Sequence, residues 1–253
     1  TTGTPLNNIG KYIGATGAWS NMGGGTTPGL NSTVNSIEVF DNQTKTIGGN
    51  FTADSNSNDM AYVSRYDVSN NTFAPLQDPQ ITPYGVNGIV NAVEVDASNN
   101  CIYIGGNFST AGEIIATYVA RYDLTNKKWE SLSGVATVTT SYIYKTAGEG
   151  VGTSGSAVYA LYWDSVNGRL FVGGAFTKVQ SDQIDANNIA YWTPGPGNSA
   201  SGSWSPLNGN GGQGVIDGIG GVYAIVEGIE KFQDPTPLKH IEWAIGILFF
   251  GVI

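Results

Sequence analysis

The sequence of 253 residues has few of the residue types on which catalytic sites and disulfide-stapled modules depend. It contains one cysteine, Cys101, and one histidine, His240. A single cysteine excludes an internal disulfide framework. A single histidine excludes a copper site built from several His ligands, and no nucleophile-elbow sequence surrounds His240. Cys101 lies in an apolar segment, so we interpret it as a small buried residue rather than a reactive thiol.

Charged residues are also scarce. Lys and Arg number 11 against 20 Asp and Glu, the charged fraction is 12%, and the formal net charge is -9. The chain therefore lacks the basic field that binds nucleic acid or an anionic membrane surface, and we predict neither partner. Low charge and a lone cysteine favour an extracellular or surface-exposed setting.

Long apolar runs are absent as well. The apolar tail at residues 243–253 has about half of the roughly 20 residues that span a bilayer. We interpret it as a β-strand, and a truncated membrane anchor is the alternative. The first residues include neither an initiator Met nor a signal-peptide pattern, so we expect the chain to come from something longer.

What the sequence does contain is a repeat, clearest at residues 90–132. Its apolar residues alternate in four short runs separated by turn residues, which predicts four antiparallel strands, a to d. Strand b ends in Gly105-Gly106, where a neighbouring strand can approach closely. Strand d contains Trp129 and Leu132. One such meander cannot bury both of its faces, so it needs copies stacked beside it.

Copies precede and follow this stretch. Residues 34–76 and 158–207 repeat all four strands, residues 8–25 resemble strands c and d, and residues 222–253 resemble strands a and b in degenerate form. We predict an all-β fold, a β-propeller of three whole blades and two half blades. The half blades could pair and close the chain as one four-bladed domain, and a fragment of a longer array is the alternative.

The order Gly-Gly, Tyr-Asp and Trp-x-x-Leu is similar to kelch-type propeller repeats. Its variant here, GGNF(T/S), ARYD and W..L, resembles the repeats of fungal cortical polarity-marker proteins and of secreted bacterial and large-virus repeat proteins. The resemblance covers residues 8–226 and implies kelch-like four-stranded blades, which serve enzymes, adhesins and adaptors alike. Departures are Phe73 in place of the strand-d Trp, Gly251-Val252 in place of two glycines, and residues 227–243, which match no other blade.

The long connections are predicted to share one face of the disc. The d-to-a and b-to-c connections fall on this long-loop face, and the short a-to-b turns fall on the other. Tyr84, Tyr142 and Tyr144 lie in these loops, where planar rings would contact a glycan or protein ligand. Packing of the same rings against the disc is the alternative.

Two carboxylates occupy equivalent strand-a positions, Glu38 and Glu94. Near a propeller axis such a pair could do acid and base work on a glycoside. Coincidence that follows from the repeat is the safer interpretation, because later blades lack the carboxylate.

One polar loop resembles the start of a calcium loop through its alternating oxygen side chains, Asp54, Asn56, Asn58 and Asp59. The sixth position lacks Gly and the twelfth lacks Glu, so we interpret it as a solvated loop and predict no metal and no cofactor. Glycosylation sequons occur at Asn31, Asn42, Asn50, Asn70 and Asn107. They permit modification without arguing for it.

Together these features predict a non-catalytic extracellular or surface repeat domain that binds a glycan or protein through its long-loop face. One alternative is a structural component of a cell wall, extracellular coat or virion, with self-assembly through terminal blade edges, since an uncovered apolar edge recruits another chain. The second alternative is a glycoside-acting enzyme that uses the channel carboxylates.

Overall fold

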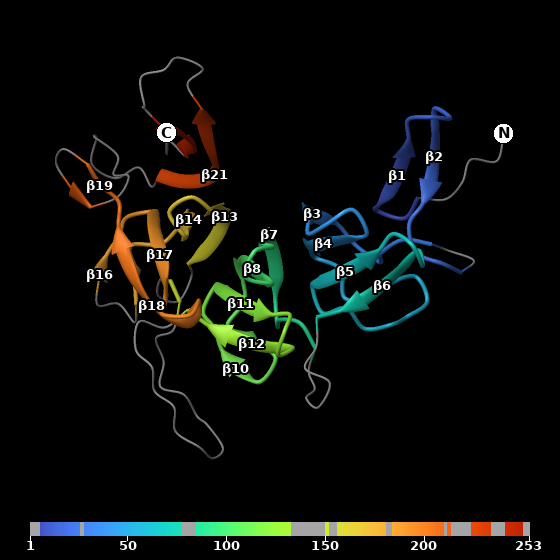
Figure 1. The fold of residues 1–253 in the computed structure, drawn as a ribbon, viewed down its shortest axis with the longest axis horizontal. Coiled ribbons are helices and arrows are strands. Elements are labelled where there is room, and N and C mark those ends of the chain that lie inside the picture. The colour runs from blue at the N-terminus through green and yellow to red at the C-terminus, as the bar shows by residue number, and fades with distance from the viewer. Residues whose placement is uncertain are drawn as a thin grey trace.

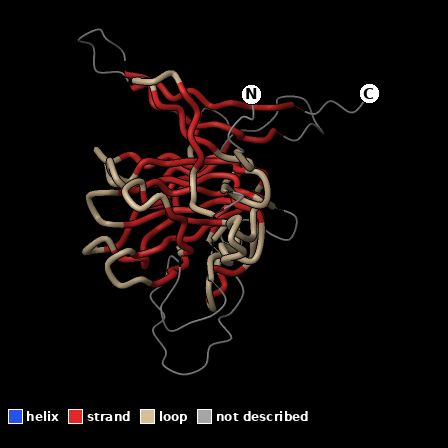
Figure 2. Tube along the Cα trace, turned by 90° about the vertical axis from the view of Figure 1, so that its right-hand side faces the viewer, coloured by secondary structure: helices blue, strands red, loops and turns tan. Residues whose placement is uncertain are grey.

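The computed structural model describes residues 6–25, 28–76, 84–132, 150–151, 156–180, 184–209, 212–213, 224–233 and 241–249. This part of the chain consists of strands and connecting loops and contains no helix (Figure 2). The predicted all-β fold is confirmed. Accordingly, no helix that could cross a membrane occurs in the described ranges.

Three four-stranded antiparallel sheets form the blades, as predicted, and within each sheet the strands follow in chain order. Blade one contains β3 (Val34–Val39), β4 (Thr44–Gly49), β5 (Val63–Asp67) and β6 (Thr72–Pro75). Blade two contains β7 (Ile89–Asp96), β8 (Cys101–Asn107), β11 (Val119–Asp123) and β12 (Lys128–Ser131). Blade three contains β13 (Ala157–Asp164), β14 (Arg169–Ala175), β17 (Ile189–Gly195) and β18 (Ser199–Pro206).

A two-stranded sheet lies at each end of the array. β1 (Gly10–Ile13) pairs with β2 (Ala18–Asn21), and β21 (Ala224–Gln233) pairs with β22 (Ile241–Phe249). The blades follow an arc with β1–β2 at one end and β21–β22 at the other (Figure 1). These two hairpins belong to separate sheets, so their pairing into one closing blade stays a prediction.

A bulge at one position of each inner strand pair fixes the register of the repeats. The pairing shifts at Val34/Ser36, Val90/Ala92, Val158/Ala160 and Val226/Gly228. In the fourth copy of strand a, Val226 therefore corresponds to Val34, Val90 and Val158. The sequence pattern had assigned this correspondence to Val222. Strand b is Ile241–Phe249 rather than residues 248–253, because Gly246 takes the place of the first strand-b glycine opposite Gly228.

The glycine pair of strand b allows close packing in two directions. A Cβ on Gly48 would collide with Val90, and a Cβ on Gly105 would collide with Val158, each on the inner strand of the next blade. A Cβ on the second glycine, Gly106, would meet a main-chain carbonyl oxygen at the start of its own inner strand. The predicted close approach at the glycine pair is confirmed.

The long connections contain short hairpins that the sequence predicted only as loop: β9 (Thr110–Ala111) with β10 (Ile114–Ile115), β15 (Lys178–Val179) with β16 (Ile184–Asp185), and β19 (Asn208–Gly209) with β20 (Gly212–Gln213). The d-to-a and b-to-c connections meet, as predicted for a shared face, since Leu30 bridges Asp54 and Val86 bridges Ala111. Strands this short carry too little periodicity to be recognised.

The apolar core lies between consecutive blades. At the start of the array four apolar side chains remain 48–59% exposed, and we call them the open face: Tyr12, Trp19, Ile37 and Val39. In later blades the residues at these positions pack against the blade before, as Val93 packs against blade one. The open face thus has two parts, Tyr12 and Trp19 on the β1–β2 hairpin and Ile37 and Val39 on β3, and each is apolar surface that packing between blades covers elsewhere in the array.

Candidate functional site

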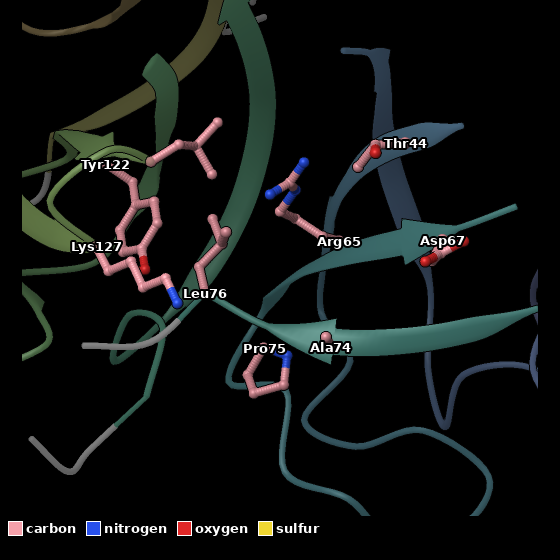
Figure 3. A pocket seen from close by; sticks show the side chains of 9 residues that line it. Thr44, Arg65, Asp67, Ala74, Pro75, Leu76, Tyr122 and Lys127 are labelled. Atoms are coloured by element: carbon pink, nitrogen blue, oxygen red, sulfur yellow. The ribbon is translucent and has the colours of Figure 1, made fainter. Parts of the chain in front are cut away.

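A groove of about 340 Å³ lies between the outer strands of blades one and two (Figure 3). The side chain of Arg65 extends from β5 toward blade two, and Lys127 comes from the turn between β11 and β12. The groove thus combines two cations with apolar surface and one carboxylate. Its lining residues are Thr44, Arg65, Asp67, Ala74, Pro75, Leu76, Tyr122, Leu124 and Lys127.

Arg65 is held in place by an aromatic ring. Its guanidinium carbon lies 5.3 Å from the centre of the Phe40 ring, a cation–π contact that limits its motion. The Nε atom is buried and has no hydrogen-bond partner. Burial lowers the pKa of Arg65 from its usual value, and the Asp41 carboxylate opposes that shift. An unpaired buried N–H costs about 1–3 kcal/mol, so an acceptor oxygen placed here would be stabilising.

The two carboxylates that act electrostatically on Arg65 are engaged in their own turns. Asp67 accepts hydrogen bonds from the side chains and main-chain N–H groups of Ser69 and Asn70, which lower the pKa of Asp67 to about 2. Asp41 accepts main-chain hydrogen bonds from Gln43 and Thr44. Across the described ranges neither carboxylate forms an ion pair with Arg65.

The arginine at the same position of blade two, Arg121, has both of the partners that Arg65 lacks. Its Nη1 donates to the carbonyl oxygen of Asn198 at 2.5 Å, and its Nε forms an ion pair with Glu130 Oε2 at 3.3 Å, although these two atoms form no hydrogen bond and Nε is buried like that of Arg65. On the neighbouring outer strand Glu130 stands opposite Arg121, whereas Ala74 stands opposite Arg65. The hairpin β17–β18 is longer than β11–β12, so blade three reaches Arg121 with Asn198.

No motif in the sequence points to Arg65 or Lys127 as functional residues. A comparison of the repeats at strand d contains the signal, because blade two has Trp-Glu where blade one has Phe-Ala. The repeat pattern retained the arginine in both blades and changed only its cross-strand partner.

Three tyrosines were predicted to contact a ligand, and the structure describes one of them, Tyr84, which does not line the groove. Tyr84 is half-buried in the connection before β7, and Tyr142 and Tyr144 fall outside the described residues. Their role in binding stays a prediction.

Hydrogen bonds within the polar loop at residues 54–59 engage its side chains. Asp54 is buried and accepts hydrogen bonds from the main chain of Asn56 and from the main chain and side chain of Asn58. Asp59 accepts one from the main chain of Ala61. These bonds engage carboxylate oxygens that a hard cation would need. In the part of the chain that the structure describes, no group of three His, Cys, Asp or Glu could hold a metal ion.

All five sequon asparagines are exposed. The side-chain amide of Asn31 donates to Thr52 Oγ1, and that of Asn70 donates to Asp67. Glycosylation at either asparagine would replace one of the two hydrogens of this amide and leave one donor. Modification of Asn31, Asn42, Asn50, Asn70 and Asn107 stays a prediction.

The two strand-a carboxylates do influence each other. Burial, together with the charge of Glu38, raises the pKa of Glu94 to about 8, and a hydrogen bond from the main chain of Trp163 opposes the shift. Burial also raises the pKa of Glu38. A carboxyl group that is protonated near neutral pH can serve as an acid, but it is also what desolvation between packed inner strands produces.

Cys101 is buried, as predicted. Burial raises the pKa of its thiol, and the side-chain amide of Asn198 donates to its Sγ at 3.7 Å. Cys101 is therefore a packing residue between blades two and three. His240 lies outside the described residues.

Comparison with known proteins finds a matching family model and relatives among fungal proteins. Residues 63–142 match the family model described as the Rax2 C-terminal beta propeller domain. Polarized growth protein L1 of Phoma sp. is 30% identical over 141 residues, which are 53% of this chain and 10% of that protein. Polarized growth protein RAX2 of Candida albicans is 32% identical over 77 residues, which are 30% of this chain and 6% of that protein.

The alignments thus cover a tenth or less of the length of these curated relatives. The family match spans strands c and d of blade one and all of the described part of blade two, so it includes both arginines. The predicted resemblance is confirmed: this chain contains β-propeller repeats like those of the Rax2 C-terminal domain and is similar to fungal polarized growth proteins.

Proposed function

We propose that this chain is a non-catalytic recognition domain of a protein of polarized growth, exposed at the cell surface, and that it binds a protein partner. The names of its relatives support the role in polarized growth. The observation that carries recognition is the groove at Arg65, where the arginine faces open space between two packed blades and has Ala74 instead of a glutamate opposite it. Exposed sequons and one buried cysteine fit a surface setting.

Labelling of living cells tests this function. A fluorescent form of the purified domain is added to fungal cells during polarized growth, next to an unrelated protein of similar negative charge as the control. We expect saturable labelling concentrated at growth sites and removed by prior protease treatment of the cells. Uniform labelling, or none, contradicts the proposal. Loss after glycosidase treatment alone would assign a glycan partner instead.

The long-loop face is tested in the same assay. Replacement of Tyr84, Tyr142 and Tyr144 by Ala removes the three aromatic side chains that the sequence predicts to contact a ligand on this face. Labelling that these variants lose assigns the partner to the long-loop face, and labelling that they retain excludes these three side chains as its contacts.

A structural role in an assembly is the second candidate, and the open face supports it. Tyr12 and Trp19 are 57% and 59% exposed although they are large and apolar. Sedimentation of the domain at rising concentration tests this role. Association that Trp19→Ser abolishes supports it, and a monomer at every concentration contradicts it. Glycoside chemistry at Glu38 and Glu94 receives no support from the relatives.

A further inference from the structure

We propose that the groove between blades one and two binds an acidic peptide segment whose carboxylate pairs with Arg65. The inference rests on the proposed function and names the chemistry of the protein partner. Its basis is the pair of arginines, Arg65 and Arg121, that occupy one position in consecutive blades.

Arg121 shows which groups this position binds. Arg121 forms an ion pair with the carboxylate of Glu130, with 3.3 Å between Nε and Oε2. Its Nη1 donates a hydrogen bond to the main-chain carbonyl oxygen of Asn198 at 2.5 Å. Both are groups that a peptide supplies, and the forked guanidinium suits two acceptors at once. A uronic acid would supply a carboxylate without the amide carbonyl. The chemistry at this position therefore favours an acidic peptide.

At Arg65 none of the described residues provides either of these two groups. Ala74 takes the place of the glutamate and is exposed, and across the described residues Arg65 makes no hydrogen bond to the turn that contains Lys127. The groove of about 340 Å³ occupies this space. Since Arg65 is held against Phe40, its donors are oriented before a ligand arrives, which lowers the entropic cost of binding.

The other lining residues define the composition of the segment. Leu76 and Tyr122 are largely buried and give the groove an apolar wall (Figure 3). An apolar residue next to the acidic residue of the peptide would pack against this wall. Lys127 supplies a second positive charge at the rim. Asp67 would repel a second carboxylate at the far end, since its low pKa keeps it ionised. One acidic residue beside an apolar residue is thus the favoured ligand.

The test uses blocked tripeptides on the complete ¹⁵N-labelled chain. The probes are acetylated and amidated Leu-Glu-Ala, its Leu-Gln-Ala counterpart, and galacturonic acid, and the readout is the NMR signal of the Arg65 Nε–Hε group. We expect a saturable shift with the Glu tripeptide and at least tenfold weaker binding of the other two probes. Equal binding of the Gln tripeptide or of galacturonic acid overturns the inference.

Two variants test the position of the site. Ala74→Glu supplies the internal partner that Arg121 has, so we expect tripeptide binding to fall at least tenfold while the melting temperature is kept. Val166→Glu adds the same charge at a residue of blade three that is 78% exposed, and binding should not change. If Ala74→Glu fails to fold, Arg65→Gln replaces it, with the same loss expected and the shift of the backbone amide signals of β5 as readout. Unchanged binding in either variant overturns the inference.

Failure of this inference is distinguishable from failure of the proposed function. Labelling of growth sites by the wild-type domain without any tripeptide binding overturns the acidic-peptide ligand and leaves the recognition role standing. Absence of labelling overturns the recognition role itself.

Discussion

Gly48 of blade one lies against the side chain of Val90 in blade two, with no space for a methyl group between them. The same contact joins Gly105 to Val158 at the next interface. Because a strand-b glycine faces an inner-strand valine of the next blade at both of these interfaces, the strands of consecutive blades pack with their backbones close together.

Gly48→Ala should destabilise the domain by about 1–3 kcal/mol, since the added methyl group forces Val90 and the inner strand to move. Urea denaturation measures the change in the free energy of unfolding. Gly24→Ala is the matched control, because a Cβ there meets nothing within 4 Å. Equal effects of the two substitutions would show that the interblade contact does not limit stability.

Val93→Ala should cost about 2 kcal/mol, because Val93 is 3% exposed between blades one and two. Ile37→Ala, at the same position of the preceding blade, should cost less although it removes more atoms, since Ile37 is 48% exposed. Both are measured by urea denaturation. A larger cost for Ile37→Ala would mean that another part of the chain covers the open face in solution.

Trp204→Phe should cost about 1–3 kcal/mol, because it removes a buried hydrogen bond from Trp204 Nε1 to the carbonyl oxygen of Leu132 at 2.9 Å. Trp129 holds the same strand-d position in blade two, but its buried Nε1 has no partner. Trp129→Phe should therefore cost less, and blade one already has Phe73 there. Thermal melting of both variants checks the order, which the reverse result would refute.

The stability of the domain should fall as the pH rises from about 5 to 8. Glu94 has a raised pKa of about 8 in the folded chain against an ordinary value of 4.5, so between these values the folded state binds more protons than the unfolded state. Glu94→Gln should flatten this slope, which melting temperatures across the pH range measure. Asp67→Asn is the control, because the lowered pKa of Asp67 makes stability depend on pH only below about pH 4, so this substitution should leave the slope between pH 5 and 8 unchanged. An unchanged slope in Glu94→Gln would show that Glu94 is ionised throughout.

The blades were predictable because each strand carries its own signal. Alternating apolar residues define strands such as β7 and β8, and the glycine pairs define where strand b ends. The start of the last hairpin was misplaced, since residues 222–226 imitate strand a in composition and only the bulge at Val226/Gly228 fixes the true register. Pairing across strands is not visible in a single segment.

The groove could not be predicted from residue types alone. A solitary Arg65 in a repeat is unremarkable until its neighbour across the strand is known to be Ala74 and not a glutamate. The length of the β17–β18 hairpin matters equally, because it decides whether a turn from the next blade reaches the arginine. Both facts depend on which residues of different strands lie side by side, and the pattern of residue types along one strand does not show this.

The arginine at the centre of strand c has a consequence for how such arrays diversify. Duplication of a blade copies the arginine together with the strands that hold it. A single later replacement of the opposing glutamate by a small residue, as at Ala74, then leaves that copy of the arginine without its internal partner. The polar contacts at each interface can therefore change while the glycines and valines at which consecutive blades pack stay the same.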